Sequence, residues 1–330
     1  MRRAAHRSRV ILFALFAALA AIAALASACA GPLVEECLRG DLDVRYCDRD
    51  GDMVADPARE PPIRLDPERI IFAYTPVEDP AQYRDVWAGF LDHMERTVGR
   101  DVLFFPVQSN AAQIEAMRAG RLHVAGFNTG SVPLAVNCAG FIPRVMMAEA
   151  DGSYGYEMEL LTHRESGIES VEDIRGRTVA FTSPTSNSGF KAPSVLLESE
   201  FGLVAGRDFE IAFSGRHDNS VLGVLQRDYD AAAVANVVIA QVLARGVGSY
   251  EDLRMLYRSE TFPTTAFGVS SRLDADLAEE VVRAFFTFEW EGSELAAEFI
   301  EEQFVPVTYA EHWEVIRQID IASGTSWGCR

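Results

Sequence analysis

The chain is poor in positive charge. Its 330 residues include 30 Lys and Arg against 49 Asp and Glu, a formal net charge of −19 at pH 7. Proteins that bind nucleic acid, or anionic membranes through a basic patch, need an excess of positive charge. The composition therefore argues against both classes, and no nucleic-acid partner is expected.

The chain also lacks the common signatures of enzymes. It has no G-x-S-x-G elbow joining a strand to a helix, no H-E-x-x-H zinc motif and no phosphate-binding P-loop. Its six His residues are scattered, so a His-rich metal site is not expected. No base stands in an evident pair with a Ser or Cys nucleophile. The sequence thus predicts a protein that is not an enzyme.

A long apolar run occurs at the N-terminus. Basic residues come first, residues 10–26 are almost all apolar, and Ser27-Ala28-Cys29 follow. This is the pattern of a secretory signal peptide over 1–28, and the run is short for a spanning helix. The junction is either an A-x-A cleavage site or a bacterial lipobox that lipidates Cys29, although Ala26 stands where Leu is usual. We favour the lipobox, which predicts a lipid-anchored protein in the periplasm or at the cell surface.

The cysteine count agrees with export. Beyond Cys29, the chain has Cys37, Cys47, Cys138 and Cys329, an even number that suits an oxidising compartment. We expect a local Cys37–Cys47 disulfide, which leaves Cys138 and Cys329 to tie the C-terminus to the body. The alternative is that they are isolated thiols.

Residues 29–68 are rich in Asp, Arg and Pro and resemble a tether with one compact acidic loop. Asp48, Asp50, Asp52 and Asp56 recur at short intervals around Gly51. Calcium takes six to eight oxygen ligands, and this spacing could wrap several around one ion. The loop resembles the short calcium loops of thrombospondin-type repeats. A structural calcium and a merely solvated acidic turn both remain open, and no other cofactor is expected.

From residue 69 the pattern alternates between strands and helices. This alternation predicts an α/β fold with mixed sheets flanked by helices, divided into two lobes. Lobe 1 is expected to comprise residues 69–162 and 262–330, and lobe 2 residues 163–261. The C-terminal part, from about Asp274, is expected to be mainly helical. The predicted strands are residues 70–74, 102–105, 122–127, 158–162, 178–181, 209–213, 229–234 and 253–257.

The loop at residues 182–190 joins a predicted strand to a predicted helix. It is crowded with small hydroxyl and amide side chains. A helix N-terminus exposes unpaired N–H groups and the positive end of the helix dipole, so it can hold an anion without a metal. The alternative is a polar loop that only caps the helix.

The chain from Ile70 to about Ile319 resembles the phosphate-, phosphite- and phosphonate-binding proteins of ABC importers, the PhnD-type branch of type II periplasmic binding proteins. The resemblance implies the two-lobed fold of that class, with a ligand cavity between the lobes. It also implies that the serine-rich loop and a His bind the phosphoryl or phosphonyl oxygens. The segments that carry it are residues 117–125, 151–156, 174–177, 183–193, 215–217 and 230–232.

The family's site residues transfer to this sequence by position. The resemblance implies that the loop and His217 donate hydrogen bonds to the ligand, the His in either charge state, and a nearby anion would favour the imidazolium. Residues of the first lobe are implied to face the cavity, although aromatic residues there more often pack than bind. The implied ligand-binding residues are Thr185, Ser186, Asn187, Ser188, His217, Tyr74, Asn128 and Thr129.

Some positions depart from the family pattern. Asn187 stands where Thr is common, and two family Tyr residues fall on Phe127 and Asn110. Members that bind an aminoalkylphosphonate place carboxylates opposite the anion. The corresponding stretches here, 236–237 and 264–265, have none, which favours phosphate, phosphite or methylphosphonate.

The predicted function is therefore an exported solute-binding protein that captures a small phosphorus oxyanion. It would act as a monomer and deliver this ligand to an ABC permease in the membrane. The alternative is a sensory or structural lipoprotein that keeps the oxyanion-binding fold without transport. A calcium-dependent adhesin built on the acidic loop is a third, weaker hypothesis.

Overall fold

The computed structural model describes residues 37–56, 64–77, 82–324 and 329. The predicted signal peptide (1–28) and the lipidation site Cys29 lie outside these residues. All helices and strands below belong to the compact unit that begins at Arg39. Within the described ranges, no helix combines the length and apolar character that crossing a membrane requires.

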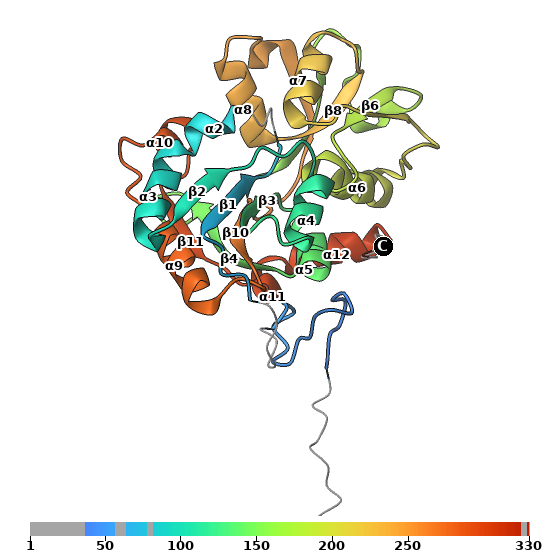
Figure 1. Cartoon of the computed structure of the whole chain (residues 1–330). Helices are drawn as coiled ribbons and strands as arrows, with labels where there is room; N and C mark the ends of the chain where they lie inside the picture. Colours follow the sequence, from blue (N-terminus) through green and yellow to red (C-terminus); the bar gives the residue numbers. More distant parts are fainter. Residues whose placement is uncertain (1–36, 57–63, 78–81, 325–328, 330) are drawn as a thin grey trace, which may run out of the picture. The chain divides into compact units, whose positions relative to one another are not determined.

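The first sheet has six strands in the order β11-β4-β10-β3-β1-β2 (Figure 1). Strand β1 pairs in parallel with β2 and β3, whereas β10 runs antiparallel to β3 and β4, and β11 antiparallel to β4. The sheet is therefore mixed. Its strands are β1 (Arg69–Tyr74), β2 (Asp101–Phe104), β3 (Val124–Phe127), β4 (Phe141–Ala148), β10 (Ala266–Ser270) and β11 (Gln303–Pro306).

The second sheet has five strands in the order β7-β6-β8-β5-β9. Strand β6 is parallel to β7 and β8, while β5 is antiparallel to β8 and β9. Both sheets thus combine a parallel βαβ part with antiparallel strands. The strands are β5 (Met158–His163), β6 (Thr178–Phe181), β7 (Glu210–Phe213), β8 (Ala231–Ala235) and β9 (Leu253–Arg258).

Helices connect these strands. They are α2 (Tyr83–Val86), α3 (Ala88–Val98), α4 (Asn110–Arg118), α5 (Val132–Ala139), the 3₁₀ helix η1 (Val171–Ile174), the π-helix η2 (Asn187–Lys191), α6 (Ala192–Phe201), α7 (His217–Leu225), α8 (Asn236–Ala244), the 3₁₀ helix η3 (Tyr250–Asp252), α9 (Ala275–Phe286), α10 (Glu294–Glu298), α11 (Tyr309–His312) and α12 (Glu314–Ala322). The η2 helix runs directly into α6, so the serine-rich loop opens one continuous helical segment.

Two clusters of buried apolar side chains cover the two faces of the first sheet. Successive side chains of a strand point to opposite faces, so Phe72 of β1 joins one cluster and Ala73 the other. Figure 1 shows α3 and α9 on one side of this sheet and α4 and α5 on the other. Helix α3 packs into the cluster that contains Phe72. Its contributing residues are at helical spacing, namely Phe90, Leu91, Met94 and Val98.

The chain passes between the two sheets in two neighbouring segments. Tyr156 and Phe262 exchange backbone hydrogen bonds of 3.0 and 2.8 Å there, as an isolated antiparallel bridge. The first crossing lies between β4 and β5. The expected boundary after residue 162 is therefore too late, because β5 pairs with β8 and β9 in the second sheet.

The predicted fold class is confirmed, and so is the long-range disulfide. Cys138 of α5 is bonded to Cys329 with an S–S distance of 2.01 Å. Cys37 and Cys47 are each in a disulfide as well. Strands β4, β10 and β11 were not predicted, because Pro143, Gly268 and Pro306 interrupt their apolar pattern. The apolar helix α8 was also missed.

Candidate functional site

A cavity of about 1050 Å³ lies where loops from both sheets meet. Its wall includes the first residues of four helices, α4, η2, α7 and α8, each of which follows a strand. The carboxyl ends of parallel strands lie at one edge of a sheet, so the helices that follow them begin beside the cavity, where the positive ends of helix dipoles lie. The arrangement is suited to an anion.

The serine-rich loop forms part of this wall. Ser186 caps the η2 helix, and its Oγ accepts a hydrogen bond of 3.1 Å from the N–H of Gly189. A Cβ on Gly189 would lie 2.0 Å from the Thr182 hydroxyl oxygen, so this tight turn needs glycine. Ser186 and Ser188 are both buried. The loop therefore caps the helix, and its residues 182–188 also line the cavity.

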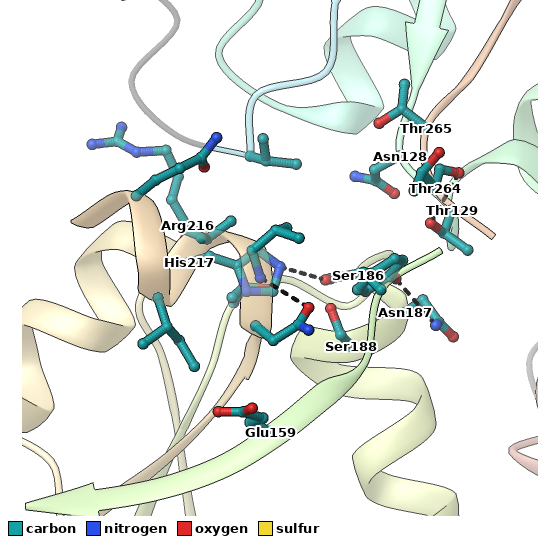
Figure 2. Close-up of a pocket in the computed structure, with 18 of the residues that line it drawn as sticks. Asn128, Thr129, Glu159, Ser186, Asn187, Ser188, Arg216, His217, Thr264 and Thr265 are labelled. Carbon is teal, nitrogen blue, oxygen red and sulfur yellow. Dashed lines mark hydrogen bonds between the residues drawn. The ribbon is translucent and has the colours of Figure 1, made fainter. Parts of the chain in front are cut away.

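His217 begins α7 and faces the loop, as Figure 2 shows. Its Nε2 lies 3.3 Å from Ser186 Oγ, and its Nδ1 accepts a 3.2 Å hydrogen bond from the N–H of Ala235. Because Nδ1 is an acceptor, the ring proton is on Nε2. Burial lowers the pKa of His217 to about 4. Burial therefore favours the neutral imidazole.

Direct hydrogen bonds join the loop to the first sheet. Asn110, at the start of α4, donates from Nδ2 to Thr185 Oγ1 at 2.9 Å and accepts from the Thr75 hydroxyl at 3.2 Å. A Cβ on Gly130 would lie 2.4 Å from the backbone nitrogen of Asn187. Only glycine at position 130 therefore lets the two segments approach this closely.

The Asn187 side chain contacts Tyr156, in the first of the two segments that cross between the sheets. Its Nδ2 lies 3.3 Å from the hydroxyl of Tyr156, which burial leaves with a raised pKa. Tyr156 also hydrogen-bonds to the Thr129 side chain, whose hydroxyl donates to Pro263 O at 2.6 Å. Tyr156 was not among the predicted site residues. Its signal was present, because residues 151–156 carry part of the family resemblance.

Two further predicted residues have structural partners in the first lobe. The Asn128 side-chain oxygen accepts from the N–H of Ser131 at 3.0 Å, just before α5. Tyr74 is buried, borders the cavity and packs edge-on against Tyr83, with ring centroids 4.6 Å apart. All eight predicted ligand-binding residues border this one cavity, and Asn128, Thr129 and Tyr74 shape its wall.

Lys191, the only lysine in the sequence, ends the η2 helix and was missed. Its ammonium group lies 2.8 Å from Asp320 of α12 and donates to Gly130 O at 2.6 Å. Lys191 is 4% exposed and Asp320 is fully buried. Burial lowers the pKa of Lys191 and raises that of Asp320. This ion pair fixes the far side of the loop.

Carboxylates border the cavity as well, which the sequence analysis did not foresee. Glu159 of β5 is buried and pairs with Arg258 at 2.6 Å, and Glu298 lies 3.6 Å from Arg245. Burial raises the pKa of Glu301 in the same wall. The absence of acidic residues from 236–237 and 264–265 therefore does not leave the cavity without them.

The acidic loop lies apart from this cavity. Oxygens of Asp48, Asp50 and Asp52 come within 4.8 Å of one another, a group that could hold a cation. Asp56 does not join them, because its carboxylate accepts the N–H of Arg49 at 2.5 Å. The loop's own N–H groups donate to the other three carboxylates: Gly51 and Met53 to Asp48, Asp52 to Asp50, and Val54 to Asp52.

Comparison with known proteins places this chain in a family. A sequence profile described as "ABC transporter, phosphonate, periplasmic substrate-binding protein" matches residues 72–313. The phosphate-import protein PhnD of Mycolicibacterium smegmatis is 26% identical over 270 residues, 77% of this chain and 82% of that protein. The phosphonates-binding periplasmic protein of Escherichia coli is 24% identical over 196 residues, 58% of each chain.

Solved structures share the fold. A binding protein component of an ABC phosphonate transporter from Pseudomonas aeruginosa has a TM-score of 0.69 at 20% identity, covering 78% of this chain and 86% of its own. PhnD1 from Prochlorococcus marinus, in complex with methylphosphonate, has a TM-score of 0.69 at 16% identity, covering 79% of this chain and 100% of its own. The fold is that of type II periplasmic binding proteins. With a profile match over residues 72–313, the chain belongs to the periplasmic substrate-binding proteins of phosphonate ABC transporters.

Proposed function

We propose that this protein captures a small phosphorus oxyanion in the cavity and delivers it to an ABC permease. The observation that carries the proposal is the convergence of the serine-rich loop and His217 on one cavity at helix N-termini. Hydroxyl, imidazole and backbone N–H donors from separate elements can surround an oxyanion without a metal. Transport proteins of this kind bind the ligand unchanged, so no catalytic group is needed.

The ligand class follows from the relatives together with the donors. One relative is named for phosphate import, another for phosphonate binding, and a structural neighbour holds methylphosphonate. Phosphate, phosphite and alkylphosphonates are therefore the ligands to test first. Aminoethylphosphonate belongs with them, because Glu159, Glu298 and Glu301 border the cavity.

The proposed roles differ among the predicted residues. Ser186, Ser188 and Thr185 are proposed to act through their side-chain hydroxyls, and His217 through its hydrogen bond to Ser186. Asn187 is proposed to donate from its backbone, because its side chain is held by Tyr156. Tyr74, Asn128 and Thr129 are proposed to shape the wall, since packing or hydrogen bonds to the protein occupy them.

Calorimetric titration tests the proposal. Phosphate, phosphite, methylphosphonate, aminoethylphosphonate and sulfate would each be titrated into the purified protein. We expect tight binding of a phosphorus oxyanion and weaker binding of sulfate. Absence of heat with every phosphorus ligand would reject the function. Growth of a deletion strain on the bound ligand as sole phosphorus source then separates import from a sensory role.

Export and anchoring belong to the same proposal. Membership of a periplasmic family and the disulfides both support an oxidising compartment. Lipidation at Cys29 is tested by labelling cells with a fatty-acid analogue, which Cys29→Ala should abolish. Gel filtration tests the expected monomer. Calcium at Asp48, Asp50 and Asp52 stays a separate prediction that oxyanion binding does not require.

A further inference from the structure

The hydrogen-bond donors around the serine-rich loop carry no net charge. Resting on the proposed function, we propose that the site takes its phosphorus oxyanion in the singly charged, protonated form. His217 then acts as a neutral positioning residue that aims the hydroxyl hydrogen of Ser186 at the ligand.

The first step is the direction of the hydrogen bonds at His217. The N–H of Ala235 points at Nδ1 from 3.2 Å, so a proton on Nδ1 would place two N–H groups against each other. The imidazole therefore keeps its single proton on Nε2, which faces Ser186 Oγ at 3.3 Å. A hydrogen bond to the neutral form of a titratable group disfavours its charged form.

The second step is the hydroxyl of Ser186. A serine hydroxyl has two acceptor positions and one donor. The N–H of Gly189 fills one acceptor position and His217 Nε2–H fills the other. The hydroxyl hydrogen is then available only for donation. A ligand oxygen in the cavity is its natural acceptor, since Ser186 borders that cavity.

The third step is the pairing of nearby cations. Arg216 lies 3.2 Å from Asp218, and Figure 2 shows its side chain extending away from Ser186 and Ser188. Lys191 is paired with Asp320 behind the loop.

The remaining described arginines of the cavity wall are engaged too. Arg258 pairs with Glu159, Arg254 with Glu169 at 3.4 Å, and Arg164 donates to the carbonyls of Glu251 and Leu253. Among the described residues, every cation of this wall thus has a protein partner. Glu157, just before β5, accepts a hydrogen bond from the Asn236 side chain.

These pairings set the charge that the cavity accepts. Each helix N-terminus is equivalent to about half a positive charge. Together with neutral hydrogen-bond donors, these N-termini can balance one negative charge. A second negative charge would have to leave water without a cation that is free to turn toward it, at a large desolvation cost. The ligand is therefore expected to keep one proton when bound.

Binding of methylphosphonate tests this inference, measured from about pH 5, where an ordinary His is charged, to about two pH units above the ligand's second pKa. We expect constant affinity while the ligand is singly charged, then a loss of about tenfold per pH unit above its second pKa, the slope of one proton. His217→Gln should show the same slope, since Gln can accept from Ala235 and donate to Ser186 but cannot titrate. His217→Ala should bind more weakly than His217→Gln.

The outcomes separate this inference from the function itself. Affinity that is flat or rises with pH would overturn the preference for a single charge. A slope that disappears in His217→Gln would place the proton on the imidazole and overturn the neutral role. Failure of phosphate, phosphite and methylphosphonate to bind at any pH would instead reject the proposed function.

A second measurement does not depend on the variants binding ligand. The imidazole signals of His217, assigned by their absence from the His217→Gln spectrum, would be followed by NMR with and without methylphosphonate. We expect the signature of the neutral Nε2–H form throughout the same pH range. An imidazolium signature on ligand addition would overturn the inference.

Discussion

Two loops of this chain look like ion sites in the sequence, and the structure separates them. The serine-rich loop (182–190) and the acidic loop (48–56) each gather ion-binding side chains within nine residues. In the serine-rich loop, Ser186 meets His217 of α7 and Thr185 meets Asn110 of α4, around a cavity. In the acidic loop, the carboxylates instead accept hydrogen bonds from the loop's own backbone.

The difference teaches what converts a cluster of polar residues into a binding site. Groups from one short segment can satisfy each other, and then little binding capacity remains. Groups fixed by separate elements, such as His217 and Ser186, can all point toward a ligand that lies between them. The comparison predicts large effects from changes at the serine-rich loop and small ones at the acidic loop.

The largest expected effect comes from the ion pair behind the serine-rich loop. Lys191→Met leaves the fully buried carboxylate of Asp320 without its partner, so we expect a loss of about 3–5 kcal/mol in the free energy of unfolding. Chemical denaturation measures it. Arg49→Met is the matched change at the acidic loop, where Arg49 and Asp56 lie 3.6 Å apart and are about one-fifth exposed. There we expect less than about 1 kcal/mol.

A second variant tests whether the unpaired charge of Asp320 causes this loss of stability. Replacing both partners, Lys191→Met with Asp320→Leu, removes the unpaired charge and should recover most of the loss. Equal losses of unfolding free energy in Lys191→Met and Arg49→Met would contradict the comparison. The ion pair behind the serine-rich loop would then stabilise the protein no more than the one at the acidic loop.

The next effect is a pH dependence of opposite sign at the two loops. The pKa of His217 is about 4 in the folded protein, below its usual 6.5, so the unfolded chain binds more protons between these values. Stability contributed by neutral His217 is present above pH 6.5 and is lost as the pH falls through about 4, by about 3 kcal/mol. Burial and neighbouring carboxylates raise the pKa of Asp52, so acidification favours the folded acidic loop.

Urea unfolding of the wild type and of His217→Gln at about pH 7 and about pH 4 measures the contribution of His217 to this pH dependence. The stability advantage of the wild type over the variant should shrink on acidification. An advantage that does not change with pH would mean that His217 titrates normally. Asp52→Asn, compared in the same way, should show the opposite trend.

A smaller effect is expected for ligand affinity. Ser186→Ala and Ser188→Ala should each weaken oxyanion binding by about 1–3 kcal/mol if their hydroxyls donate to a buried anion. Ser194→Ala is the control, because the Ser194 hydroxyl on α6 donates to Phe190 O of η2 and Ser194 does not border the cavity. Asp50→Asn in the acidic loop should leave calorimetric affinity unchanged. Equal losses in Ser194→Ala would show a general effect of the helix rather than a binding role.

The sequence predicts much of the fold because local pattern and burial agree in most elements. Strands β1, β6 and β9 were found as apolar runs between turn signals, and α3 from its helical spacing. The pattern fails where long-range pairing decides the structure. Strand β10 contains Gly268 and pairs with β3 and β4, partners distant in the chain.

The same limit applies to the site. The serine-rich loop and His217 were found because small polar residues follow predicted strands and match a family. Lys191 could not be found in this way, because its role depends on Asp320 of α12, far along the chain. The tautomer of His217 depends on the backbone N–H of Ala235, which no sequence pattern reveals. Groups joined only by tertiary structure remain invisible to sequence reasoning.

The smallest expected effect is that of calcium on the acidic loop. One oxygen from each of three carboxylates, all within 4.8 Å, supplies three of the six to eight ligands that calcium prefers, so we expect weak binding, with a Kd of about 1 mM. At about 1 mM calcium this stabilises the folded protein by about 0.4 kcal/mol. Thermal unfolding with calcium, magnesium or a chelator measures it; Asp50→Asn should abolish the gain, and Asp92→Asn on α3 should keep it. A gain of several kcal/mol would contradict the comparison, because the acidic loop would then hold its ion as firmly as separate elements do.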